Sequence, residues 1–160
     1  MTSPLRHLEL EVVPPGPVDV VLALGSNLGD RLATLQAGVD ALAAEPGVDV
    51  VSASGVVETV PVGGPQQDDY LNAVLLVRCS LSPRELLAAC HRAETGQGRE
   101  RLVRWGPRTL DVDVITYDAL VSADPALTLP HPRAHERAFV LVPWAQVDPG
   151  AVLADRKSVV

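Results

Sequence analysis

The sequence predicts a single α+β domain in which helices cover one face of a mainly antiparallel sheet. Three observations lead to this fold class. Apolar, β-branched runs alternate with segments of helical periodicity, and their order is β-α-β-β-α-β, a split arrangement of βαβ units. The 160 residues suffice for one hydrophobic core, and no internal repeat or second domain is present.

The first half of the chain supplies two strands and a helix after an irregular start. Residues 1–17 contain four prolines and are expected to form a flexible N-terminal extension, which leaves 18–160 as the domain. A buried strand is predicted over 18–27. A helix is predicted over 30–47, where leucines and a valine recur at helical spacing before Pro-Gly. The alternating, β-branched run 48–60 predicts a second strand.

The second half continues from a loop over 60–69, which is rich in glycine, proline and amides. A strand is predicted over 70–79. A helix should then begin with the capping box of Ser82 and Glu85 around Pro83, and run to about Thr95.

A cationic loop over 96–107 separates this helix from a third interior strand over 108–118. A turn and a last helix are expected within 127–149.

Composition excludes several classes of protein. A hydrophobic content of 47% with 21% charged residues argues against a disordered chain. The net charge of −7 argues against a nucleic-acid partner. No apolar run is long enough to span a bilayer, and the first 20 residues lack the apolar core of a secretory signal, so a cytoplasmic protein is expected. Cys79 and Cys90 have no metal-ligand spacing and are interpreted as reduced core residues.

The positive charge is concentrated in one segment. Of 12 arginines and one lysine, five arginines fall within 17 residues: Arg92, Arg99, Arg101, Arg104 and Arg108. Because the planar guanidinium binds phosphate oxygens in pairs, this segment favours a phosphate ligand. A solvated basic loop is the alternative interpretation.

Two aspartates follow this segment on the predicted strand. Alternation places Asp111 and Asp113 on one face, about 6–7 Å apart, with their apolar neighbours on the other face. Carboxylates this close repel each other unless a cation lies between them. Mg²⁺ is such a cation, and it usually adds substrate phosphates to one or two carboxylates. The alternative is a solvated edge of a half-buried sheet.

Other nucleotide-binding signatures are missing. The segment GSNLG at 25–29 lacks the lysine of a P-loop and the third glycine of a dinucleotide-binding fingerprint. From local physics it is a strand-to-helix turn capped by Asn27 or Asp30.

Four blocks of sequence together resemble the 6-hydroxymethyl-7,8-dihydropterin pyrophosphokinase family of folate biosynthesis. They are LALGSNLGDR (22–31), ETVPVGGPQQDDYLNAVL (58–75), HRAETGQGRERLVRWGPRTLDVDVI (91–115) and LTLPHPRAHERAFVLVP (127–143). The blocks occur in the family's order and spacing from about residue 18 to 150, and RWGPRTLDVDV is the most specific of them.

The resemblance implies a ferredoxin-like fold with α-β-α layering and transfer of pyrophosphate from MgATP to the pterin, which releases AMP. It implies two Mg²⁺ ions on Asp111 and Asp113, and catalytic roles for these acids and for Arg99, Arg101 and Arg108. The implied ATP-binding residues are Glu94, Arg99, Arg101, Arg108, Val114, Thr128, His131 and Arg137. The implied pterin-binding residues are Thr59, Val60, Val62, Tyr70, Asn72, Trp105 and Phe139. It also implies that loops 60–69 and 96–107 close over the substrates.

The residue types suit these roles. The chain has five aromatic residues, and three of them, Tyr70, Trp105 and Phe139, fall within the blocks. A flat bicyclic ring is bound well by aromatic faces together with an amide such as Asn72 for its edge.

The chain departs from the family pattern at several positions. The arginine loop is about one residue shorter than in the best-known members. His91 stands where glutamine is frequent, and Pro132 replaces a frequent tyrosine. Ala126 stands where some members have a nucleotide-contacting arginine, so that contact is expected to be absent.

Two other functions agree with part of the pattern. One is a ferredoxin-like regulatory module that binds nucleotide without turnover, although such a module needs no paired metal carboxylates. The other is a kinase that moves one phosphoryl group and releases ADP. The protein is expected to be a monomer that contacts other enzymes of the folate pathway.

Overall fold

The computed structural model describes residues 9–27, 29–59, 70–98, 110–134 and 138–150. The elements are β1 (Val18–Ser26), α2 (Arg31–Ala43), β2 (Val48–Ala53), β3 (Val57–Thr59), β4 (Tyr70–Cys79), α3 (Pro83–Gly98), β5 (Asp111–Tyr117), β6 (Ser122–Asp124), β7 (Leu127–Leu129) and α4 (Ala138–Val147).

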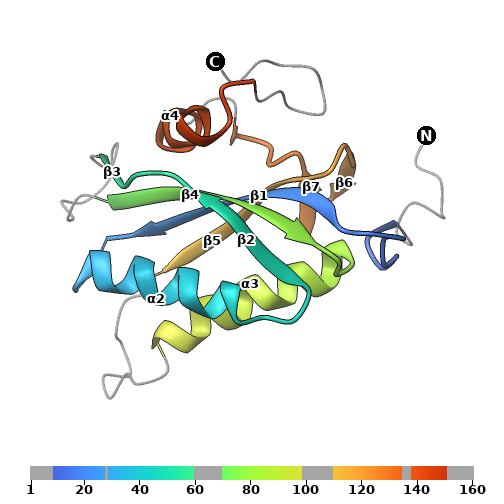
Figure 1. Ribbon diagram of the computed structural model, residues 1–160, viewed down its shortest axis with the longest axis horizontal. Coiled ribbons are helices and arrows are strands. Elements are labelled where there is room, and N and C mark those ends of the chain that lie inside the picture. The colour runs from blue at the N-terminus through green and yellow to red at the C-terminus, as the bar shows by residue number, and fades with distance from the viewer. Residues whose placement is uncertain (1–8, 28, 60–69, 99–109, 135–137, 151–160) are drawn as a thin grey trace.

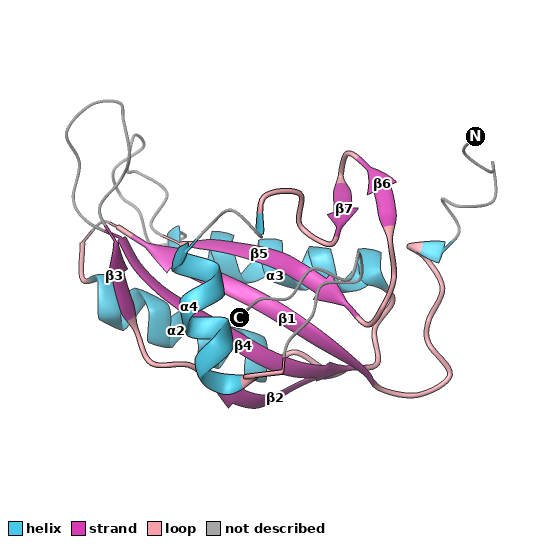
Figure 2. Cartoon of the chain, turned by 90° about the horizontal axis from the view of Figure 1, so that it is seen from above, coloured by secondary structure: helices cyan, strands magenta, loops and turns pink. Residues whose placement is uncertain are grey.

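One antiparallel sheet organises the described residues. Its strand order is β2-β4-β1-β5, with β3 also paired to β4, while β6 and β7 form a separate hairpin. Helices α2 and α3 lie on one face, and α4 lies on the other, as Figure 1 shows. Seen from above, α4 crosses over the sheet (Figure 2). The ferredoxin-like fold with α-β-α layering that the resemblance implies is confirmed. The expectation from the element pattern that helices cover only one face was wrong, because α4 packs on the other face.

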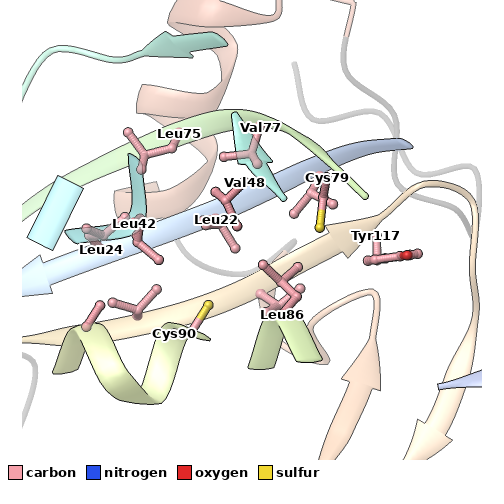
Figure 3. Packing of buried hydrophobic residues seen from close by; sticks show 14 of the residues in the cluster. Leu22, Leu24, Leu42, Val48, Leu75, Val77, Cys79, Leu86, Cys90 and Tyr117 are labelled. Carbon is pink, nitrogen blue, oxygen red and sulfur yellow. The ribbon is translucent and has the colours of Figure 1, made fainter. Parts of the chain in front are cut away.

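The main core lies between the sheet and α2 and α3. Leu22 and Leu24 of β1, Leu42 of α2, and Leu86 and Cys90 of α3 are all buried in it (Figure 3). Burying a leucine of this kind contributes roughly 1.5–3 kcal/mol. A smaller cluster on the opposite face joins Val21, Ala23, Val74 and Ile115 to Val140 and Trp144 of α4. The structure therefore has three layers: α2 with α3, the sheet, and α4, which buries the second cluster.

β5 contributes side chains to both clusters and contains a bulge. The register with β1 pairs Val21 with Thr116 and Leu22 with Val114, so Ile115 is the additional residue. Val114 lies in the main core and Ile115 in the α4 cluster, as alternation along the strand gives, and the bulge shifts the pairing of the residues that follow.

Both predicted helix starts are confirmed. Asp30 caps α2, because its carboxylate accepts a hydrogen bond from the Ala33 N–H at 3.1 Å. The Ser82 hydroxyl accepts from the Glu85 N–H at 3.2 Å, and the Glu85 carboxylate accepts from the Ser82 N–H at 3.0 Å. This reciprocal pair is the predicted capping box. It holds α3, which carries Glu94, against the sheet.

The expected strand over 48–60 was wrong as a single element. β2 ends at Ala53 and β3 begins at Val57. Between them, the Ser54 N–H donates to the Val74 carbonyl at 2.9 Å, while the Val74 N–H donates to the Ser54 hydroxyl at 2.9 Å. The serine side chain replaces a backbone acceptor, so the ladder along β4 is interrupted here.

The turn expected within 127–149 is present, since the Ala134 N–H donates to the His131 carbonyl at 3.2 Å. Residues 127–129 before it form the second strand of a hairpin, β6–β7, which the sequence did not predict. Asp124 forms its turn, because its carboxylate accepts from the Ala126 N–H at 2.8 Å. The last helix occupies only 138–147 of the expected range.

The N-terminal segment contributes one anchor to the core. Leu10 is 1% exposed and packs in the main cluster. Its carbonyl accepts from the Arg84 N–H at 2.8 Å, which ties residues 9–11 to the start of α3. The flexibility expected for residues 1–17 stays a prediction. None of the helices in the described ranges combines the length and apolarity needed to cross a membrane.

Both cysteines are free and buried, as predicted. Burial raises the pKa of the Cys90 thiol to about 12, and the Glu94 and Asp113 carboxylates act in the same direction. Burial also raises the pKa of Cys79.

We therefore expect neither thiol to react with a disulfide reagent at pH 8 in the folded protein, because the thiolate is the nucleophile. Both thiols should react at once in urea. The absorbance of the thiolate that the reagent releases measures the reaction. Rapid labelling of the native protein at either cysteine would contradict this packing.

Candidate active site

Asp111 and Asp113 project from β5 on the face that α4 covers. Across β1, Asp111 lies opposite Gly25, and Asp113 lies opposite Ala23, which belongs to the α4 cluster. Directly paired residues of antiparallel strands share a face. Both aspartates are half-buried. The predicted sharing of one face is therefore confirmed, and neither acid is a fully solvated surface residue.

The residues between and after these acids point to the opposite face. Val112 and Val114 are buried in the main core. The side chain of Val114, an expected ATP-binding residue, thus lies on the far side of the sheet from the two carboxylates. Only the backbone of Val114 can therefore contact a nucleotide that lies near the two carboxylates.

Glu94 binds the strand that carries the acids. The backbone N–H of Val112, between Asp111 and Asp113, donates to Glu94 Oε2 at 2.8 Å. Among the described strands β5 lies at the edge of the sheet, so no strand in that part of the chain pairs with this N–H on its outer side. A carboxylate from α3 supplies the missing acceptor and fixes the strand at this point.

His131 and Thr128 lie on the chain that follows β5. The His131 N–H donates to the Ile115 carbonyl at 2.8 Å, so residue 131 continues along the same outer edge. His131 Nδ1 accepts from the Arg133 N–H at 3.3 Å. The Thr128 hydroxyl, on β7, donates to the Asp124 carbonyl at 2.9 Å. The structure therefore brings His131 and Glu94 to one edge of β5.

Tyr70 and Asn72 lie on β4, on the other side of β1 from the acids. Asn72 pairs with Gly25, and Gly25 pairs with Asp111, so the three residues form one row across three strands. Asn72 is only 5% exposed, and its Nδ2 donates to the Val57 carbonyl at 3.5 Å. Tyr70 is half-buried one step further along the same face. The expected pterin amide and Asp111, one of the two expected metal acids, thus lie in one row.

Two further pterin candidates are placed by their backbones only. Thr59 ends β3 and pairs with Tyr70, and Phe139 is in the first turn of α4. The remaining candidates lie outside the described residues: Val60, Val62, Arg99, Arg101, Trp105, Arg108 and Arg137.

The two acids fit Mg²⁺ better than a metal held by protein alone. In the described parts of the chain, no group of three or more His, Cys, Asp or Glu side chains could hold a metal. Zinc sites use three or four such ligands. Mg²⁺ instead keeps water and takes phosphate oxygens beside one or two carboxylates. This pair could hold Mg²⁺ together with a triphosphate.

A cavity of about 560 Å³ lies elsewhere, between residues 9–18 and the turn 117–120. Three prolines and two valines are among its lining residues. It adjoins the C-terminal end of β5, whereas Asp111 is the first residue of that strand. The cavity is therefore separate from the site of the acids, and its lining carries none of the expected site residues.

The role of Gly25 did not follow from the sequence, which indicated a turn at 25–29. The structure places Gly25 inside β1, between Asn72 and Asp111. The available signal was a glycine at the end of a buried apolar run, because such a glycine often marks a close approach.

A family model described as 7,8-dihydro-6-hydroxymethylpterin-pyrophosphokinase (HPPK) matches residues 21–149. The chain belongs to this family. The HPPK match covers every described site residue and both loops that enter β4 and β5.

Curated relatives agree with the HPPK assignment. A 2-amino-4-hydroxy-6-hydroxymethyldihydropteridine pyrophosphokinase of Methylorubrum extorquens is 46% identical over 82% of this chain and 84% of its own length. The enzymes of that name from Mycobacterium bovis and Bacillus subtilis are 48% and 42% identical, over 84% and 79% of this chain and 74% and 75% of their own lengths.

Solved structures share the HPPK fold. A Plasmodium falciparum HPPK-DHPS matches with a TM-score of 0.73 at 12% identity, over 95% of this chain. An HPPK-DHPS in complex with substrates matches with a TM-score of 0.71 at 10% identity, over 90% of this chain. This chain spans 46% and 42% of those longer chains.

The contact of Glu94 with β5 predicts a difference between two substitutions. Glu94→Ala removes the acceptor of the buried Val112 N–H and should lower the free energy of unfolding by about 1–3 kcal/mol. Glu94→Gln keeps an oxygen acceptor and should cost well under half of that. Urea unfolding of both variants measures the difference. Equal losses in the two variants would show that the hydrogen bond does not hold the strand.

Proposed function

We propose that this protein transfers the pyrophosphoryl group of MgATP to the hydroxymethyl group of 6-hydroxymethyl-7,8-dihydropterin, giving the pterin diphosphate and AMP. One observation carries the proposal beyond family membership. Asn72, Gly25 and Asp111 form a continuous row across β4, β1 and β5, which supports a ring-binding amide and a metal-binding acid at the two ends of one substrate.

The spacing in this row suits that assignment. Two strand-to-strand steps separate Asn72 from Asp111, which is about 10 Å. A bicyclic ring held at its far edge by Asn72 would direct its substituent toward Asp111. Tyr70 lies two residues before Asn72 on β4 and therefore on the same face, which supports a contact with such a ring. We assign Thr59, Val60, Val62, Trp105 and Phe139 to the same pterin pocket on the family pattern alone.

The second substrate belongs on the outer side of β5. Glu94 and His131 lie along this edge, beside the strand that carries the acids. We assign ATP to these two residues, to the backbone of Val114 and to Thr128. Arg99, Arg101, Arg108 and Arg137 are assigned to the phosphates on the family pattern, since guanidinium groups bind phosphate in pairs.

Two Mg²⁺ ions on Asp111 and Asp113 complete the proposal. When bound, they would neutralise phosphate charge and hold the triphosphate in line for attack. The chain's own part is to present both carboxylates on one face, at a strand that Glu94 holds in place. Positioning of this kind can lower the barrier by several kcal/mol without any covalent step.

The reaction is a substitution at the β-phosphorus of ATP. The pterin hydroxyl oxygen forms a bond to this phosphorus, and the bond from the β-phosphorus to the oxygen that bridges it to the α-phosphate breaks. AMP leaves with that bridging oxygen, and the hydroxyl proton is lost to solvent. In a loose transition state the alcohol needs little activation, so no dedicated base is assigned. The arginines are assigned to the charge that develops on the phosphates.

The proposal includes the cytoplasmic location, the monomeric state and the contact with folate-pathway enzymes expected above. A Lactococcus lactis relative is named a bifunctional protein FolKE, and it is 43% identical over 76% of this chain. Joining of two enzymes in one chain supports such a contact between separate ones. Light scattering of the purified protein would test the monomer.

The product nucleotide tests the reaction. Protein, MgATP and the reduced hydroxymethylpterin should yield AMP in equal amount to the pterin diphosphate, as separated by anion-exchange chromatography. A chelator such as EDTA should abolish the reaction, because the carboxylates alone repel the triphosphate. ADP as the product would instead indicate a kinase that moves one phosphoryl group. Binding of nucleotide without any product would indicate the regulatory module.

Removing either carboxylate charge tests the metal assignment. Asp111→Asn and Asp113→Asn keep the side-chain shape and should each lower turnover by about 100-fold or more, because transition-state charge loses its support. The circular dichroism spectrum should not change. Asp118→Asn is the matched control: it is exposed just beyond β5 at a positive φ of 51°, which asparagine also tolerates. Near-normal turnover in either site variant would reject the assignment.

A further inference from the structure

The row that contains both proposed binding functions has a glycine at its centre. Gly25 lies between Asn72 and Asp111, paired with one on each side. Glycine weakens the interior of a strand, since it brings no side chain to pack. Its backbone torsions are not in the positive-φ region here, so the local conformation accepts any residue. The reason for glycine at this position is therefore space.

The space at Gly25 is occupied by the side chain of Asn72. A Cβ added at Gly25 would lie 3.0 Å from Asn72 Oδ1 and 3.6 Å from Tyr70 Cδ1. The distance to Asn72 Oδ1 is shorter than an ordinary van der Waals contact, whereas the distance to Tyr70 Cδ1 is an ordinary one. An alanine would thus displace the Asn72 amide and leave Tyr70 in place.

The orientation of the Asn72 amide follows from this approach. Its Nδ2 donates to the Val57 carbonyl on β3, and its Oδ1 lies over Gly25 on β1. The amide therefore lies across the sheet, spanning from one neighbouring strand to the other. A side chain at position 25 would force the Asn72 Oδ1 to move by a few tenths of an ångström from this orientation. A buried amide makes precise hydrogen bonds because an unsatisfied one is costly.

We propose that Gly25 is a specificity-determining positioning residue, which holds the Asn72 amide in the orientation that reads the pyrimidine edge of the pterin. This inference rests on the proposed function, since it assigns the ring to Asn72. A site built to hydrogen-bond a substrate group rejects analogues that lack the group far more strongly than an apolar pocket does. Gly25 acts on the substrate only through Asn72.

Kinetics of Gly25→Ala test the proposal. The KM for the pterin should rise about tenfold or more, because small misplacements of a binding group are costly. The KM for ATP should change by less than about twofold. Selectivity for the pterin over the 7,8-dihydrolumazine analogue, in which an oxygen replaces the 2-amino group, should fall by a similar factor. Gly16→Ala is the matched control, because a Cβ there meets nothing within 4 Å.

A double-variant comparison isolates the part played by Asn72. In an Asn72→Ala background the conflict no longer exists, so adding Gly25→Ala should leave the pterin KM unchanged within about twofold. An equal rise in both backgrounds would overturn the proposal, as would an unchanged pterin KM in a folded Gly25→Ala variant. The double variant relieves the crowding, so it decides the question even if Gly25→Ala alone does not fold.

Failure of the inference and failure of the proposed function are distinguishable. If the wild type releases AMP while Gly25→Ala either leaves the pterin KM unchanged or raises it equally in both backgrounds, only the role of Gly25 is wrong. If the wild type releases no AMP, the proposed function fails. Calorimetric titration of the pterin into wild type and Gly25→Ala then measures the same loss of affinity without turnover, and equal affinities would reject the role of Gly25.

Discussion

The pairing of β1 with β4 on one side and β5 on the other is the constraint on which the rest of this structure depends. Leu22 and Leu24 must face α2 and α3, which fixes the register of β1 against both neighbours. A slip of one residue would move every side chain of a strand to the other face. The same register sets Gly25 between Asn72 and Asp111, so burial of the core also determines where the polar groups of the site meet.

Much of this fold could be predicted from local patterns, because burial imposes them. The strand at 70–79 matched residue for residue, and the capping box and the two acids on one face followed from spacing alone. The break at Ser54 could not be predicted, since it depends on a serine hydroxyl that bonds Val74, 20 residues further along the chain. Leu10 is similar: an isolated leucine among prolines has no periodicity, and only the tertiary structure provides its partners.

The features of the candidate site also fall into those that the sequence indicated and those that it could not show. Residue types and spacing indicated the carboxylates, and the family pattern indicated Asn72, His131 and Glu94. Spacing could not show that Glu94 bonds the backbone between the two acids, because that contact joins a helix to a strand that follows it after a loop. Spacing did show that the side chain of Val114 faces the core, because Val114 alternates with Asp113 and precedes the bulge at Ile115.

The outer edge of β5 connects stability with function. An unpaired edge strand exposes donors and acceptors that invite pairing with other chains. Here the Val112 N–H is satisfied by Glu94 and the Ile115 carbonyl by the His131 N–H, so the edge is covered by one helix and one following segment. Both covering residues are also those assigned to ATP. Protecting the edge therefore places the two residues proposed to bind ATP beside the strand that carries the acids, without a separate structure to hold them. A nucleotide bound there, as proposed, would lie along the same edge, so that both proposed substrates would meet at one pair of carboxylates.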